Sequence, residues 1–187
     1  FVFWNWSPDV CSSDLGLKTA GLGHQSPLGK IAAHLGHAII NGKPVAMLAG
    51  PCGDNPPIIG PAGTAHMSIL DFARWASWNA GQGKRGPRLV TPKTLKKLQT
   101  PVASMPPRPD AAPGTPSQGR YALGWGELRV DWAPYPLIYH GGSNGMNLAH
   151  IWIDPQRDLA MVLAANVGGA KAKEALLAAA AELYGKY

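Results

Sequence analysis

Apolar residues recur every three or four positions between residues 68 and 80, which is the spacing of one face of an amphipathic helix. Ser68 and Asp71 form a capping box at the start of this segment, so we expect the helix to begin there. The predicted apolar face consists of Ile69, Phe72, Trp75 and Ala76.

Two more helices are predicted by other signals. Thr91 and Pro92 favour a helix start and predict a helix over residues 91–99. Strong helix formers dominate residues 170–187 and predict a C-terminal helix.

Apolar runs rich in β-branched and aromatic residues predict strands in the C-terminal half. We expect strands over 121–130 and 136–140, then a hairpin over 146–166. Strands followed by a terminal helix in this order predict an α+β fold. In this fold, an antiparallel sheet is packed with helices, and the C-terminal helix is one of them. A chain of 187 residues suits one domain with its own core.

The N-terminal half is predicted to be mostly loop. Within residues 16–60, Asn41-Gly42 separates two apolar triplets and predicts a hairpin. Proline and glycine cluster in residues 51–61 and 105–119, which predicts long loops there.

A small-residue motif stands where one predicted strand ends and the hairpin begins. Residues 139–145 read Tyr-His-Gly-Gly-Ser-Asn-Gly. Glycine leaves backbone N–H groups uncovered, so a substrate could approach them here. His140, beside the glycine pair, is the one histidine to which we assign a role in a site.

One interpretation of this motif is the nucleophile elbow of the α/β-hydrolases. Residues 141–145 satisfy G-x-S-x-G, with Ser143 as the nucleophile. The elbow requires a helix after its serine, and an acid followed by a histidine downstream. The downstream stretch instead predicts a hairpin, and no acid lies between Ser143 and His150. The sequence therefore disfavours the elbow.

The alternative interpretation is a family resemblance. His140-Gly141-Gly142-Ser143 resembles the third motif of the serine β-lactamase and penicillin-binding-protein superfamily, whose usual form is Lys-Thr-Gly. Three more segments resemble that family in its order and extend the resemblance over about residues 15–187: Leu15–Gly23, Pro61–Asp71 and Tyr121–Trp125.

The resemblance implies acyl transfer through a serine ester, with an ester, peptide or β-lactam as substrate. It assigns one oxyanion N–H to Ser143 and a site role to His140. It also implies substrate contacts for Gly141, Gly142 and Asn144. Because histidine is mostly neutral where the family's lysine is charged, esters or peptides are expected over penicillins.

The family's nucleophile motif, Ser-x-x-Lys, and its Tyr-x-Asn motif do not occur in this sequence. Residues 77–79 match Ser-x-Asn, but we interpret them as helix surface. Residues 16–187 are therefore expected to be the C-terminal part of a β-lactamase-related domain, inactive alone. The alternative is an inert ligand-binding or degenerate member of the family.

Residues 1–15 show no hydrophobic periodicity and lack the features of a signal peptide. We expect them to be non-native or disordered. The cysteines Cys11 and Cys52 support no disulfide. The family resemblance implies a periplasmic or secreted bacterial protein.

The remaining features predict few partners beyond a small-molecule or peptide substrate. The chain has a formal net charge of +6, but its basic residues are interpreted as solvated, so no nucleic acid is expected. We expect no stable membrane insertion, no cofactor and no metal; the oligomeric state stays open. His34 and His37 are interpreted as polar loop residues, His66 as packing beside the first helix, and His150 as an outward-facing structural residue.

Overall fold

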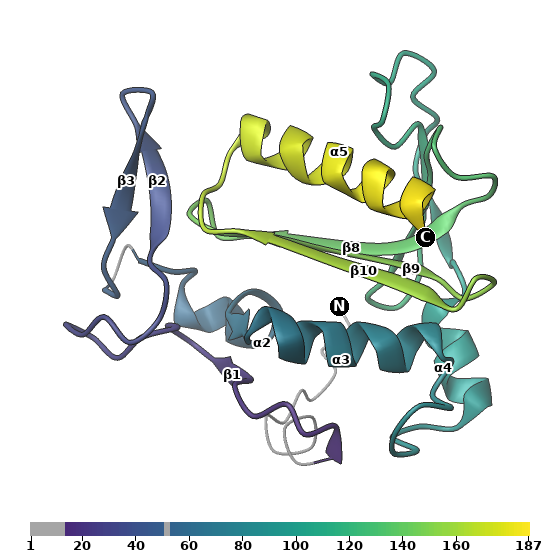
Figure 1. Cartoon of the computed structure of the whole chain (residues 1–187), viewed down its shortest axis with the longest axis horizontal. Coiled ribbons are helices and arrows are strands. Elements are labelled where there is room, and N and C mark those ends of the chain that lie inside the picture. Colours follow the sequence, from purple (N-terminus) through teal and green to yellow (C-terminus); the bar gives the residue numbers. More distant parts are fainter. Residues whose placement is uncertain (1–13, 51–52) are drawn as a thin grey trace.

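The computed structural model describes residues 14–50 and 53–187, and Figure 1 shows their arrangement. Both cysteines and almost all of residues 1–15 fall outside the described residues, so the predictions made for them stay untested. No helix among the described residues is long and apolar enough to cross a membrane.

An antiparallel six-stranded sheet forms the centre of the structure, in the order β10-β9-β8-β7-β6-β5. Its strands are β5 (Ala103–Ser104), β6 (Gln118–Tyr121), β7 (Gly126–Arg129), β8 (Leu137–Ser143), β9 (Leu148–Asp154) and β10 (Leu159–Ala165). The predicted α+β fold with an antiparallel sheet is confirmed.

The helices cover opposite faces of the sheet (Figure 1). Helix α5 (Ala170–Lys186) packs on β9 and β10 from one side, and α3 (Ile69–Ala80) packs on the same strands from the other. Helix α4 (Pro92–Gln99) stands beyond the end of α3. All three predicted helices are thus confirmed to within one residue at each end.

The face under α5 holds the larger core. Trp152 of β9, which is fully buried, packs there with Leu137, Leu177 and Tyr184. Asp154 at the end of β9 is buried too, and it accepts hydrogen bonds from the hydroxyl groups of Tyr184 (2.8 Å) and Tyr135 (2.9 Å). The C-terminal helix is therefore attached to the sheet by apolar packing and by a satisfied buried carboxylate.

The face under α3 has a smaller core. Ile151 and Ile153 of β9 pack there with Ala76, Ala80 and residues of the β6–β7 connection. Phe72 and Trp75 lie against this cluster as predicted. Ile69 does not, because 47% of its surface stays exposed at the first turn of the helix.

Two predictions about α3 and the sheet are wrong. Trp78 and Asn79 are buried rather than on the helix surface. The Trp78 indole donates to the Pro87 carbonyl (2.9 Å) in the segment that connects α3 to α4, and the Asn79 side chain donates to the Trp75 carbonyl (2.9 Å). The single strand predicted over 121–130 is two strands, β6 and β7. The backbone turns between them at Gly124, which has a φ of 87°.

The N-terminal half consists of small elements: β1 (Gly21–Leu22), β2 (Gly36–Ile40), β3 (Lys43–Met47), a 3₁₀ turn η1 (Pro57–Ile59), α2 (Gly60–Gly63) and β4 (Ala65–His66). Strands β2 and β3 form the predicted hairpin, with positive φ at Asn41 and Gly42. It projects from the body of the molecule (Figure 1). His37 is a strand residue here, which corrects its interpretation as a loop residue; its Nδ1 lies 2.8 Å from the Asn166 carbonyl oxygen.

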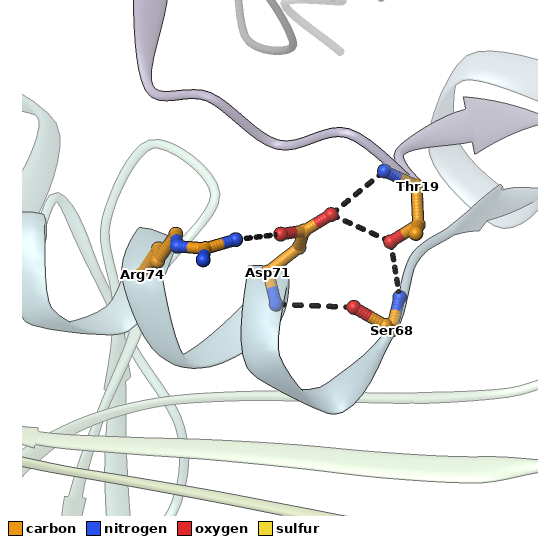
Figure 2. A network of polar contacts seen from close by, with 4 residues as sticks. All are labelled: Thr19, Ser68, Asp71 and Arg74. Carbon is orange, nitrogen blue, oxygen red and sulfur yellow. Dashed lines mark hydrogen bonds and ion pairs between the residues drawn. The ribbon is translucent and has the colours of Figure 1, made fainter.

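A polar network ties the N-terminal segment to α3 (Figure 2). The Asp71 backbone N–H donates to Ser68 Oγ (3.3 Å), which is the predicted cap. The second half of the capping box is supplied by Thr19 instead: its hydroxyl donates to Asp71 Oδ2 (2.6 Å) and accepts from the Ser68 N–H (2.8 Å). The Thr19 hydroxyl, burial, the Thr19 N–H and Arg74 act on Asp71, and their net effect lowers its pKa below 3.8.

Candidate active site

Strand β8 extends beyond its neighbour β7. Strand β7 pairs with β8 only from Leu137 to Tyr139, whereas β9 continues to pair with it as far as Ser143. Within the described residues, His140 to Ser143 therefore have no strand partner on the β7 side. Backbone donors and acceptors on that edge are left for another extended segment to use.

His140 stands at the start of this free edge. By strand alternation it shares a face with Ile138, which packs against the α3-side cluster, and with Gly142. The side chain is exposed, yet the surrounding protein removes part of its hydration and so lowers its pKa below 6.5. The imidazole is therefore neutral at physiological pH and can act as a hydrogen-bond donor or acceptor.

The two glycines that follow have different environments. A Cβ atom on Gly141 would collide with the Tyr139 hydroxyl, so the protein's own packing favours glycine at this position. A Cβ on Gly142 would meet nothing within 4 Å. Gly142 alone therefore keeps open space on the face that carries His140.

The hydroxyl of Ser143 is engaged within its own turn. It donates to the Asn147 carbonyl (2.8 Å) and accepts from the Gly145 N–H (3.0 Å). A turn and then strand β9 follow it, not a helix. The nucleophile-elbow interpretation of Ser143 is therefore wrong.

Asn144 organises the turn after β8. Its Oδ1 accepts from the backbone N–H groups of Met146 (3.1 Å) and Asn147 (2.8 Å). Its Nδ2 donates to Asp54 Oδ1 at 3.0 Å. This contact joins the motif to a loop 90 residues away, and no local signal along the chain predicts it.

His150 is buried on the opposite face, which corrects its interpretation as outward-facing. Only 1% of its surface is exposed, its ring lies edge-on to Tyr139, and its Nδ1 has no partner among the described residues. Burial, with Lys173 nearby, lowers the pKa of His150 to about 4. It lies on the other side of the sheet from His140, and the Ser143 hydroxyl makes its hydrogen bonds to Asn147 and Gly145 rather than to this histidine.

No group of three potential metal ligands comes together in the described part of the chain. His66 lies in β4, which precedes α3 in the chain, with its Nδ1 2.9 Å from the Gly23 carbonyl oxygen. His34 is exposed. Of the histidines, only His140 lies in the motif at the free edge.

These features belong to a known class of protein. A family model described as "Beta-lactamase" matches residues 13–186. The chain therefore belongs to the β-lactamase family, as the motif order predicted.

Two solved structures share the fold. An octameric penicillin-binding protein homologue from Pyrococcus abyssi is 19% identical with a TM-score of 0.66, and a class C β-lactamase is 16% identical with a TM-score of 0.58. Each match covers 91% of this chain, but only 35% of the first structure's chain and 49% of the second's. The comparison with curated proteins gave no match.

Proposed function

We propose that this chain forms the substrate-binding edge of a serine hydrolase that works through an acyl-enzyme, with an ester or peptide as substrate. The nucleophilic serine and its base would be supplied by residues outside this sequence. The observation that carries the proposal is the unpaired β8 edge from His140 to Ser143. An extended substrate could pair with that edge as an added strand.

Each motif residue has a part in this proposal. The Ser143 N–H would be one of two donors that hold the oxyanion of the tetrahedral intermediate. His140, neutral and exposed, would hydrogen-bond the substrate or its leaving group. Gly142 would leave room for the acyl group. Asn144 would act indirectly, since its side-chain hydrogen bonds are made to the turn and to Asp54.

The neutral state of His140 bears on substrate choice. A penicillin carries a carboxylate, and a charged lysine in this position would attract it more strongly than a neutral imidazole does. We therefore expect acetate esters or short peptides to be turned over faster than penicillins.

The nucleophile can be identified by covalent labelling of the complete enzyme. A fluorophosphonate should modify a serine outside residues 1–187, located by peptide mass spectrometry. A label on Ser143 would overturn the proposal. Absence of any label, in a folded complete protein, would favour the inert family member instead.

The site residues are tested by substitution in the same complete enzyme. His140→Ala should lower kcat/KM for an ester by about tenfold, because it removes a hydrogen bond to the substrate or its leaving group. His34→Ala removes another exposed histidine, away from the motif, and should leave the rate unchanged. Ser143→Ala keeps the backbone N–H and should cost far less than His140→Ala.

A further inference from the structure

Positive charge is concentrated in one segment of the chain. Between Asp71 and Asp110 the sequence contains eight Lys or Arg residues and no Asp or Glu. Since the whole chain has a formal net charge of +6, the remainder has a net charge of −2. The excess positive charge thus belongs to α3, α4 and the segments around them.

Part of this charge lines a cavity. A cavity of about 730 Å³ lies between the α3–α4 connection and α4, within the size range of small-molecule sites. Three cations line it: Lys84, Arg88 and Lys96. Val90 and Leu95 supply apolar wall, and the Gln82, Gln99 and Thr100 side chains supply polar groups.

Only one face of α4 lines the cavity, so only some of its lysines reach it. Pro92, Leu95, Lys96 and Gln99 line it, at the i, i+3, i+4 and i+7 spacing of one helix face. Lys93 and Lys97 lie on the same helix but do not line the cavity. These two lysines therefore serve as controls that separate the effect of charge on α4 from the effect of a position in the cavity.

The cations in the cavity differ from others in the segment by their lack of an acidic partner. Arg74 pairs with Asp71 and Arg85 with Asp158, and neither arginine lines the cavity. Among the described residues, Lys84, Arg88 and Lys96 have no ion pair. Three uncompensated cations around one cavity favour an anion in it.

The cavity wall is held in place by backbone hydrogen bonds. The turn after α3 is closed by bonds from the Gln82 N–H to the Asn79 carbonyl (3.0 Å) and from the Gly83 N–H to the Trp78 carbonyl (2.9 Å). Gln82 has a φ of 53°, which a residue with a side chain adopts only where its surroundings fix it. The wall is therefore formed before any ligand arrives.

We infer that this cavity binds a small organic phosphate. A phosphate monoester carries about two negative charges at neutral pH. Its three oxygens suit both a planar guanidinium and lysine ammonium groups. Val90 and Leu95 would contact the organic part. The residues of the β8 motif do not line this cavity, so the inference is independent of the proposed function.

Titration calorimetry of the 187-residue chain with phenyl phosphate tests the inference, with ³¹P line broadening as a second readout. We expect saturable binding of one ligand per chain, weaker in high salt. Lys96→Glu should weaken it by about tenfold or more, the effect of losing one charge-assisted hydrogen bond. Lys97→Glu makes the same charge change outside the cavity and should alter affinity by less than about twofold.

Two sources of the phosphate are distinguished in parallel. Co-sedimentation with phosphatidic acid vesicles, against phosphatidylcholine vesicles, tests a lipid phosphate monoester, while phenyl phosphate tests a free ester. Loss of either binding in Lys96→Glu but not in Lys97→Glu supports the site and identifies its source. If both variants lose binding equally, or if neither probe binds the folded chain, the inference is overturned. Arg88→Gln provides a second cavity variant in case Lys96→Glu does not fold.

Discussion

The sheet face under α5 and the N-terminal region from Gly21 to Ile59 differ in how they are stabilised. Under α5, Trp152 and Leu137 are almost completely buried, and Asp154 is fully hydrogen-bonded. In the N-terminal region, large apolar side chains stay exposed on several elements: Leu28, Ile31, Ile39, Ile40, Leu48 and Ile58. The core under α5 is buried, whereas much of the apolar surface of the N-terminal region is exposed. We infer that fewer internal contacts stabilise the N-terminal region.

The largest expected effect is in the α5 core. Trp152→Ala should lower the free energy of unfolding by about 3–5 kcal/mol, because it leaves a cavity where no surface is exposed. Ile58→Ala, at a position 89% exposed, should change it by less than about 0.5 kcal/mol. Urea denaturation measures both. Equal effects would mean that the two regions do not differ as described.

The same core should respond to acid through His150. Its pKa is lowered from 6.5 to about 4, so the unfolded state binds a proton more readily than the folded state. Above about pH 6.5, His150 is neutral in both states and does not lower the free energy of unfolding. As the pH falls toward about 4, protonation in the unfolded state lowers the free energy of unfolding by up to about 3 kcal/mol. His150→Leu should flatten this pH dependence and also remove the unpaired Nδ1. An unchanged pH profile in the variant would assign the dependence to another group.

The two glycines of the motif give a matched pair. Gly141→Ala places a methyl group against the Tyr139 hydroxyl and should cost about 1–3 kcal/mol of stability. Gly142→Ala enters open space and should be nearly neutral for stability. Thermal unfolding of both variants decides this, and the reverse order would contradict the assigned faces of β8.

The link between the N-terminal region and α3 should be weaker. Thr19→Val keeps the shape of the side chain but removes the hydroxyl that bridges Asp71 and Ser68, at a cost of about 1 kcal/mol. The pKa of Asp71 should rise toward its usual value. Both can be measured, by denaturation at pH 7 and by carboxyl titration in NMR. A variant as stable as the parent would show that the contact is not needed.

The smallest effect on stability is expected at the projecting hairpin. Ile40→Thr and Val45→Thr together should change the free energy of unfolding little, because 47% and 40% of these side chains are already exposed. Binding of a hydrophobic dye by the chain should decrease. Unchanged dye fluorescence would place the accessible apolar surface elsewhere.

The same contrast explains what the sequence could predict. Helices α3, α4 and α5 and the β9–β10 hairpin were predicted because their signals are local: a cap, a period or a turn. The β6–β7 turn was missed because Ala122 and Trp125, on either side of it, are apolar and buried, and so continue the pattern of a strand.

The candidate site was predicted only in part, for a similar reason. His140 to Asn144 stand out as a contiguous motif. Their use depends on contacts far apart in the chain, such as Asn144 with Asp54, and on the point where β7 stops pairing with β8. A strand's pairing length depends on its neighbour, so it cannot be derived from the strand's own residues.

The overhang of β8 also has a consequence for self-association. An unpaired strand edge is a template on which a second copy can add a strand, and edges of this kind lead to aggregation in many proteins. Glycine has low β-propensity, so Gly141 and Gly142 make the edge poor at capturing arbitrary chains. The residues that would admit a substrate therefore also limit unwanted strand addition, and a β-branched residue at Gly142 should make the protein more prone to form fibrils.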